Sequence, residues 1–89
     1  MTDIPSPQCY LYVLRSQVKE WYYIGVTNHL EDRLARHNAG RSLSTKAYAP
    51  FELIFTKSYA TKGEAMREEA RLKGLKSRER LLSYIQEGL

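Results

Sequence analysis

The sequence predicts a single small domain of the α/β (α+β) class, in which a three-stranded antiparallel sheet is flanked by helices in the order ββαβαα. The length of 89 residues accommodates one hydrophobic core and no second domain. Three short apolar runs rich in strand-forming residues precede amphipathic stretches, and the apolar content of 43% favours a folded globule. We assign residues 9–89 to this domain and residues 1–8 to a loose lead-in.

The first two strands are predicted to form a hairpin. Residues 10–14 are continuously apolar, which is typical of a central strand covered on both faces. A polar turn over residues 15–20 leads to the second strand, residues 21–26, and so short a connection favours antiparallel pairing. The third strand is predicted at residues 51–55, after a polar loop that ends in Pro50.

The first helix is predicted between Asn28 and Gly40. Asn28 with Glu31 three residues later resembles a capping arrangement, and Gly40 is a natural terminator. Leu30 and Leu34 lie one turn apart and define the face that we expect to point inward.

Two further helices follow the third strand. Thr61 and Glu64 form a capping box that opens the second helix, which we expect to end near Lys73. Gly74 and a new cap at Ser77 predict a third helix that ends near Gly88. The side chains expected to face the core are those of Ala65, Met66, Leu72, Leu81, Leu82 and Ile85.

Composition excludes several classes of protein. The single cysteine, Cys9, rules out an intramolecular disulfide and suits a reducing cytoplasm, and with two histidines it cannot by itself complete a zinc site. No apolar run approaches the ~20 residues that cross a bilayer, so we expect a cytoplasmic protein without a membrane partner. The net charge of +4 permits a nucleic-acid partner, although basic helices that merely aid solubility fit the charge equally well.

Aromatic residues on the predicted hairpin are the first chemical candidates. Tyr12 and Tyr23 lie on adjacent strands and could face each other, which by itself fits ordinary cross-strand packing. Gly25 lowers the stability of a strand and often marks a close approach of another group to the backbone. Arg33 and His37 are one helical turn apart, beside the leucine stripe, where boundary residues with partly buried stems are the alternative.

Glu69 is the most informative single residue. It falls within the apolar arc of the second helix, where a carboxylate is costly unless it is paired or bound to a metal. An ion pair with Arg33 is one alternative, and a Mg²⁺ ligand is the other. A cation, a proton acceptor and a metal-binding carboxylate are the groups that phosphodiester hydrolysis requires.

The chain resembles GIY-YIG nuclease domains, most closely the small stand-alone bacterial (UPF0213-like) proteins that are similar to the N-terminal nuclease domain of an excinuclease. The resemblance covers nearly the whole chain. The first motif departs from the family pattern, because Tyr10 stands where the family carries glycine. The matching residues are Tyr12, the segment Tyr23-Ile24-Gly25, Arg33, Leu34, His37, Asn38 and Glu69.

The resemblance implies a catalytic role for each matching side chain. Tyr12 would act as the general base and Tyr23 would position water or phosphate and support it. Arg33 would stabilise the pentavalent phosphate, and His37 would assist by proton transfer or hydrogen bonding. Glu69 would hold one divalent ion, Mg²⁺ or Mn²⁺. Since a free phenol has a pKa of about 10, Tyr12 would need help from Arg33 or from the metal.

The remaining assignments concern structure and substrate contacts. Gly25 and Asn38 are expected to shape the site. The side chains expected to contact nucleic acid are those of Arg15, Arg36, Arg41, Thr45, Lys46 and Lys73.

The resulting functional hypothesis is a metal-dependent endonuclease that hydrolyses DNA phosphodiester bonds in repair or processing. Since we expect the 89 residues to hold only the catalytic domain and no accessory DNA-binding module, target choice is expected to be structural, weak or supplied by a protein partner. Two alternatives remain: a nucleic-acid-binding module that keeps the fold without turnover, and a protein-interaction domain with solvated basic helices.

Overall fold

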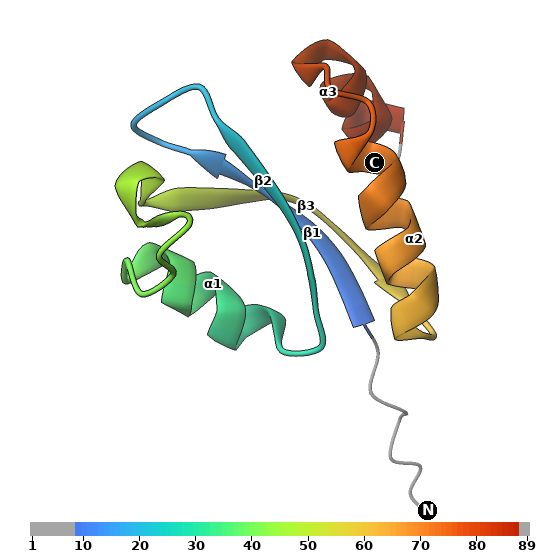
Figure 1. The fold of residues 1–89 in the computed structure, drawn as a ribbon, viewed down its shortest axis with the longest axis horizontal. Coiled ribbons are helices and arrows are strands. Elements are labelled where there is room, and N and C mark those ends of the chain that lie inside the picture. The colour runs from blue at the N-terminus through green and yellow to red at the C-terminus, as the bar shows by residue number, and fades with distance from the viewer. Residues whose placement is uncertain (1–8, 88–89) are drawn as a thin grey trace, which may run out of the picture.

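The structure, a computed structural model, describes residues 9–87 and has the predicted α+β architecture in the order ββαβαα (Figure 1). The predicted lead-in, residues 1–8, lies outside the described residues. The elements are β1 (Cys9–Ser16), β2 (Tyr22–Thr27), α1 (Leu30–Asn38), the 3₁₀ turn η1 (Lys46–Tyr48), β3 (Phe51–Tyr59), α2 (Lys62–Lys73) and α3 (Arg78–Glu87).

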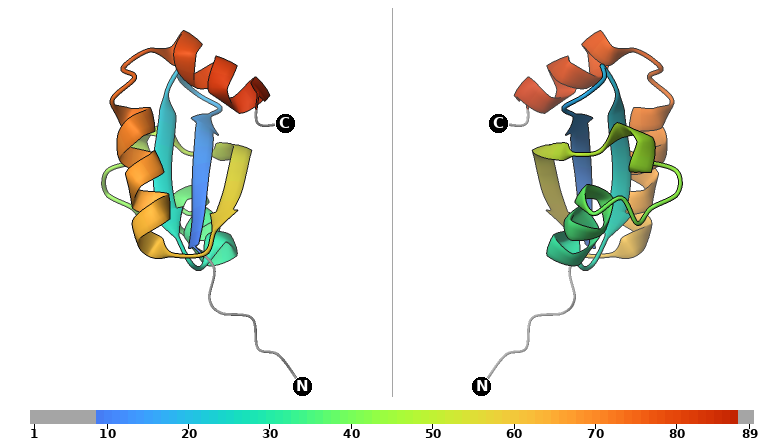
Figure 2. Two further views of the ribbon diagram at one scale, coloured as in Figure 1. Left: turned by 90° about the vertical axis from the view of Figure 1, so that its right-hand side faces the viewer. Right: turned by 90° about the vertical axis from the view of Figure 1, so that its left-hand side faces the viewer.

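The sheet has the strand order β2-β1-β3, and both pairings are antiparallel. This order confirms that the apolar run of β1 is the central strand. Helix α1 covers one face of the sheet, and α2 and α3 lie on the other, as the two side views make clear (Figure 2). Within residues 9–87, no helix has the length and apolarity that a passage through a bilayer would demand.

Alternation along β1 divides the core into two layers. Leu11 and Val13 pack with residues of α2 and α3, whereas Tyr12 and Leu14 pack with Phe51 and the apolar side chains of α1. The predicted inward face of α3 is correct for Leu81 and Ile85, which are buried. Tyr12 therefore lies on the α1 side of the sheet.

The prediction of a buried side chain is wrong for two residues. Met66 and Leu82 are 48% and 37% exposed. Each lies one position beyond a buried residue, Ala65 or Leu81, and a step of about 100° around the helix carries it off the contact face. The buried positions of α2, Ala65 and Leu72, are seven residues apart and therefore lie on one face.

The start of α1 differs from the prediction, and its end does not. Asn28 is not its cap, because the helix starts at Leu30 and the Thr27 hydroxyl instead accepts a hydrogen bond of 3.0 Å from the His29 N–H. Gly40 is the terminator as predicted, with a φ of 72°. Its N–H donates to the His37 carbonyl, and the Arg41 N–H donates to the Arg36 carbonyl, which is the Schellman pattern.

The other helix caps are as predicted. The Glu64 N–H donates to the Thr61 hydroxyl over 3.2 Å at the start of α2, and the Arg80 N–H donates to the Ser77 hydroxyl over 3.3 Å. The side chain of Asn38 connects α1 to the sheet, because its amide oxygen accepts a 2.7 Å hydrogen bond from the Phe51 N–H. The end of α1 is therefore held against the start of β3.

Candidate active site

Tyr12 and Gly25 occupy opposite positions on β1 and β2. A Cβ atom at Gly25 would lie 2.5 Å from the Tyr12 hydroxyl oxygen and 2.6 Å from its Cζ, so the tyrosine side chain lies directly over the glycine. The same atom would lie 2.9 Å from the ring of Tyr23. Glycine is the residue that lets both tyrosines share this face of the hairpin.

A hydrogen-bonded chain runs from Tyr12 through His37 to Thr45. The Tyr12 hydroxyl lies 3.2 Å from His37 Nε2, and His37 Nδ1 lies 2.9 Å from the Thr45 hydroxyl. The three residues are 1%, 1% and 0% exposed, respectively. His37 is therefore buried, unlike a boundary residue, and both of its ring nitrogens have hydrogen-bond partners.

Tyr23 lies beside this chain. It faces Leu14 across the hairpin, so it is diagonal to Tyr12 rather than directly opposite. Its ring centroid is 4.9 Å from that of His37 and 6.1 Å from that of Tyr12. The two tyrosines and the histidine thus form one aromatic cluster over Gly25.

The prediction that Thr45 contacts nucleic acid is wrong for its side chain. Thr45 is completely buried, and its hydroxyl is occupied by His37. The Thr45 hydroxyl instead orients the imidazole of His37. When Nδ1 carries the proton and donates it to Thr45, Nε2 has a free lone pair. Sequence patterns did not indicate this role, since the loop between the two residues has no regular periodicity.

The environment of His37 favours the neutral imidazole. Burial, and to a smaller extent the positive charge of Arg33, lower the pKa of His37 below its ordinary value of 6.5. At neutral pH the ring therefore carries one proton, and the nitrogen that lacks it can accept a hydrogen bond.

This lowered pKa predicts how stability depends on pH. Below about pH 6.5 the unfolded chain binds a proton at His37 that the folded chain does not, so the free energy of unfolding should fall as the pH is lowered and level off below the folded pKa. Urea unfolding between about pH 5 and 8 measures the slope. The slope should shrink in His37→Gln and persist in His29→Gln, because His29 is exposed. Equal slopes in both variants would contradict the assignment.

The Tyr12 hydroxyl is surrounded by charges of both signs. Burial first, and then the neighbouring Tyr23, raise the pKa of Tyr12 above its ordinary value of 10.0. Glu69 raises the pKa further, whereas the guanidinium of Arg33 acts in the opposite direction. Arg33 from α1 and Glu69 from α2 therefore both lie within electrostatic reach of this hydroxyl, and Tyr12 is a neutral phenol near pH 7.

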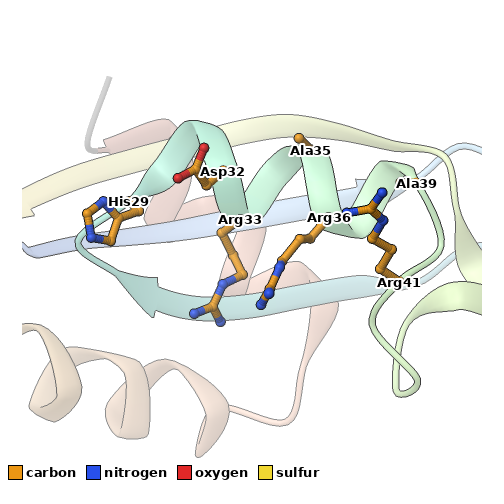
Figure 3. A pocket seen from close by; sticks show the side chains of 7 residues that line it. All are labelled: His29, Asp32, Arg33, Ala35, Arg36, Ala39 and Arg41. Carbon is orange, nitrogen blue, oxygen red and sulfur yellow. The ribbon is translucent and has the colours of Figure 1, made fainter.

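Arg33 lies where two surface hollows meet. One, of about 540 Å³, runs along α1 and is drawn in Figure 3, where the side chains of Arg33 and Arg36 extend from the same side of the helix. The other, of about 210 Å³, lies between the end of β2 and the start of α2 and includes Lys62. Lys62 was missed in the sequence, because no local pattern connects the first turn of α2 with α1.

Glu69 lies on α2 with its side chain 20% exposed. Its carboxylate is 3.2 Å from the ammonium of Lys73 one turn later, so the alternative of an ion pair with Arg33 is wrong. This contact also engages Lys73, a predicted nucleic-acid contact. Ala65 and Leu72 are buried and lie one turn before and after Glu69, whereas Met66 is exposed, so Glu69 lies at the margin of the buried face rather than in the middle of an apolar arc.

The donor set of this region suits one kind of metal ion. Among residues 9–87, no three His, Cys, Asp or Glu side chains are grouped closely enough to enclose an ion. One carboxylate fits Mg²⁺, which keeps several waters and takes phosphate oxygens from a substrate, whereas a zinc site needs more protein ligands.

The other predicted contacts are dispersed. Arg15 is exposed and lines a separate hollow formed by the β1–β2 turn, so the structure does not bring it together with Arg33. Lys46 is exposed at the start of η1 and lies next to the end of α1, because its Cβ is 3.9 Å from the place where a Cβ at Gly40 would be. Arg36 and Arg41 line the same hollow as Arg33.

Comparison with known proteins identifies the family and its similar members. Residues 8–82 match the GIY-YIG catalytic domain family. The UPF0213 protein OB0043 of Oceanobacillus iheyensis is 41% identical over 83% of this chain and 86% of its own length, and the UPF0213 protein YazA of Bacillus subtilis is 40% identical over 88% and 78%. The solution NMR structure of the UPF0213 protein BH0048 from Bacillus halodurans superposes with a TM-score of 0.58 at 30% identity, over 89% of this chain and 83% of that one.

Proposed function

Since this chain belongs to the GIY-YIG catalytic domain family, we propose that it is a metal-dependent endonuclease that hydrolyses DNA phosphodiester bonds in repair or processing. The observation that carries the proposal is the environment of the Tyr12 hydroxyl. It contacts His37 and lies within electrostatic reach of Arg33 and Glu69. A proton-transfer chain therefore lies within electrostatic reach of a cation and a carboxylate, the groups that hydrolysis of a phosphodiester requires.

Tyr12 acts in this proposal as a proton relay rather than as a free phenolate. With the imidazole proton on Nδ1 and donated to Thr45, the Tyr12 hydroxyl donates to His37 Nε2. The phenol oxygen then takes a proton from the attacking water while its own proton passes to His37. A raised Tyr12 pKa is compatible with this route, because no phenolate has to exist in the resting protein.

The other residues bind the substrate around this relay. Arg33 stabilises the negative charge that develops on the phosphate as hydroxide attacks phosphorus and the bond to the leaving oxygen breaks. Glu69 would hold the divalent ion that nucleases of this family generally use, and a bound ion supplies charge stabilisation at the leaving oxygen. Tyr12 is 1% exposed, so in this proposal the attacking water reaches its hydroxyl only when the substrate is bound. The catalytic contacts among water, phosphate and Tyr12 then form in the complex with phosphate.

The experiment that tests the proposal is a cleavage screen. Linear, nicked, flapped, branched and single-stranded DNA are incubated with the wild type, with and without Mg²⁺ or Mn²⁺. We expect metal-dependent strand scission of at least one substrate. Glu69→Ala should lower cleavage by at least about tenfold, since the loss even of an outer hydrogen-bond partner of a metal ligand costs that much.

The matched control is Glu68→Ala. Glu68 lies next to Glu69, is 22% exposed and also pairs with a basic residue of its own helix, Arg71. Its replacement removes the same charge and a similar ion pair but should leave cleavage intact. Absence of cleavage by the wild type on every substrate, with DNA binding retained, would instead identify a non-catalytic binding module.

A further inference from the structure

Each of the two hollows that meet at Arg33 is lined by at least one further cation. Lys62, at the start of α2, lines the hollow beside the end of β2. Arg36 and Arg41 line the hollow that follows α1, which we call the groove, and Figure 3 shows Arg33, Arg36 and Arg41 in this order along it. Arg33, the candidate phosphate contact, is therefore the residue that the two hollows share.

None of these four cations has a carboxylate partner within residues 9–87, and they differ from other unpaired cations such as Arg67 and Arg80 in lining the two hollows. Among residues 9–87, the ion pairs join Arg71 to Glu68, Lys73 to Glu69, and Arg78 to Glu20. None of them involves Lys62 or the three arginines of the groove. Asp32 is the one carboxylate among the groove's lining residues. Unpaired cations in a hollow focus positive potential toward an incoming polyanion.

The shape of the groove fits a chain of phosphates. Ala35 and Ala39 line it one helical turn apart, and both are exposed, so no large side chain blocks a close approach to α1. At 1.5 Å per helical residue, the part of α1 from Arg33 to Asn38 covers roughly 7.5 Å, and Arg41 follows beyond the end of the helix. One strand of a duplex carries a phosphate about every 3.4 Å along the duplex axis, so this length can accommodate at least two consecutive phosphates.

We propose that Lys62, Arg33, Arg36 and Arg41 form one continuous track for the sugar-phosphate backbone of the strand that is cut. Lys62 contacts a phosphate on one side of the scissile group at Arg33, and Arg36 and Arg41 contact phosphates on the other side. The inference deepens the proposed function and rests on it for the placement of the scissile phosphate at Arg33. The named side chains contact phosphates and therefore carry no base specificity.

The test is a binding measurement without divalent ions, so that cleavage does not enter it. Fluorescently labelled duplex DNA, single-stranded DNA and RNA are titrated with Arg36→Gln/Arg41→Gln and with Lys62→Gln over a series of salt concentrations. We expect affinity to fall about tenfold or more in the double variant and about threefold in the single one. The slope of log affinity against log salt should decrease by about 0.9 for each lost contact on duplex DNA, or about 0.7 on single strands.

Arg67→Gln/Arg80→Gln is the matched control. It removes the same net charge from exposed positions on α2 and α3 that form no ion pair within residues 9–87, and it should change affinity less than about twofold. Ala35→Glu is a second probe of the track, since it places a carboxylate on the groove while keeping a good helix former. It should weaken binding at least as much as Lys62→Gln.

The outcomes separate this inference from the nuclease proposal. Equal losses in the groove and control double variants, or unchanged binding by Ala35→Glu, would overturn the track even if the wild type cleaves DNA. A selective loss in the groove variants would support the track even if no cleavage is found. If the groove variants lose affinity for RNA but not for either form of DNA, the four cations still form a phosphate track, and RNA replaces DNA as the expected substrate.

Discussion

Replacing Tyr12 with phenylalanine is expected to lower the rate of DNA cleavage by about 10²- to 10⁴-fold, the usual contribution of a positioned proton-transfer group. The substitution removes the hydroxyl that contacts His37 over 3.2 Å and keeps the ring that fills the space over Gly25. Binding of DNA should change little, because the phosphate contacts come from arginine and lysine side chains. Single-turnover cleavage with saturating enzyme separates the rate from the affinity.

Stability has to be measured alongside activity in this variant. The loss of the hydroxyl leaves His37 Nε2 buried without its partner, which costs about 1–3 kcal/mol. Urea unfolding therefore decides whether the protein is still folded under the assay conditions.

Tyr22→Phe is the matched control for the same atom change. Tyr22 is half-buried on β2 and packs against the core cluster on the opposite face of the sheet. It should leave cleavage unchanged. If Tyr12→Phe cleaves at the wild-type rate, Tyr12 is not on the proton path and the relay has to be abandoned.

Features that depend on neighbouring residues could be predicted from the sequence. The capping box at Thr61, the cap at Ser77 and the left-handed Gly40 follow from local backbone chemistry, and each lies where it was expected. The central position of β1 was also predictable, because an uninterrupted apolar run has to be covered on both faces. Asn28 is not the cap although it fits the pattern, because α1 begins at Leu30 and His29 occupies the cap position.

Features that depend on distant segments could not be read in the same way. β3 continues to Tyr59 because the backbone of β1 pairs with it as far as Cys9, not because residues 56–59 are apolar. The buried contact between His37 and Thr45 forms through an irregular loop, and the closeness of Lys62 to Arg33 follows from how α2 packs. The motif residues thus predicted the centre of the candidate site, whereas its supporting shell required the tertiary structure.

Gly25 is the position where the smallest change should have the largest combined effect. In Gly25→Ala, the new Cβ would lie 2.5 Å from the Tyr12 hydroxyl oxygen and 2.6 Å from its Cζ, closer than non-bonded atoms approach. The Tyr12 ring has to move, and its contact with His37 is lost. We expect the free energy of unfolding to fall by about 1–3 kcal/mol, as is usual for an overpacked core.

Cleavage by Gly25→Ala should fall at least as far as in Tyr12→Phe, because the displaced hydroxyl no longer contacts His37 and its new position also obstructs the site. The control is Gly63→Ala, at a glycine of α2 where a Cβ would meet nothing within 4 Å. Since alanine is the better helix former, this variant should retain activity and gain up to about 1 kcal/mol of stability.

A double-mutant cycle identifies the cause of the effect. If the overlap with Tyr12 is responsible, Gly25→Ala should cost much less in a Tyr12→Ala background, where the ring that it would strike is absent. A cost that is the same in both backgrounds would show that the overlap with Tyr12 is not the cause, and would leave the Tyr23 ring, 2.9 Å from the new Cβ, or the backbone of β2 as the reason for the glycine. The closeness of the glycine to Tyr12 would then not explain its presence.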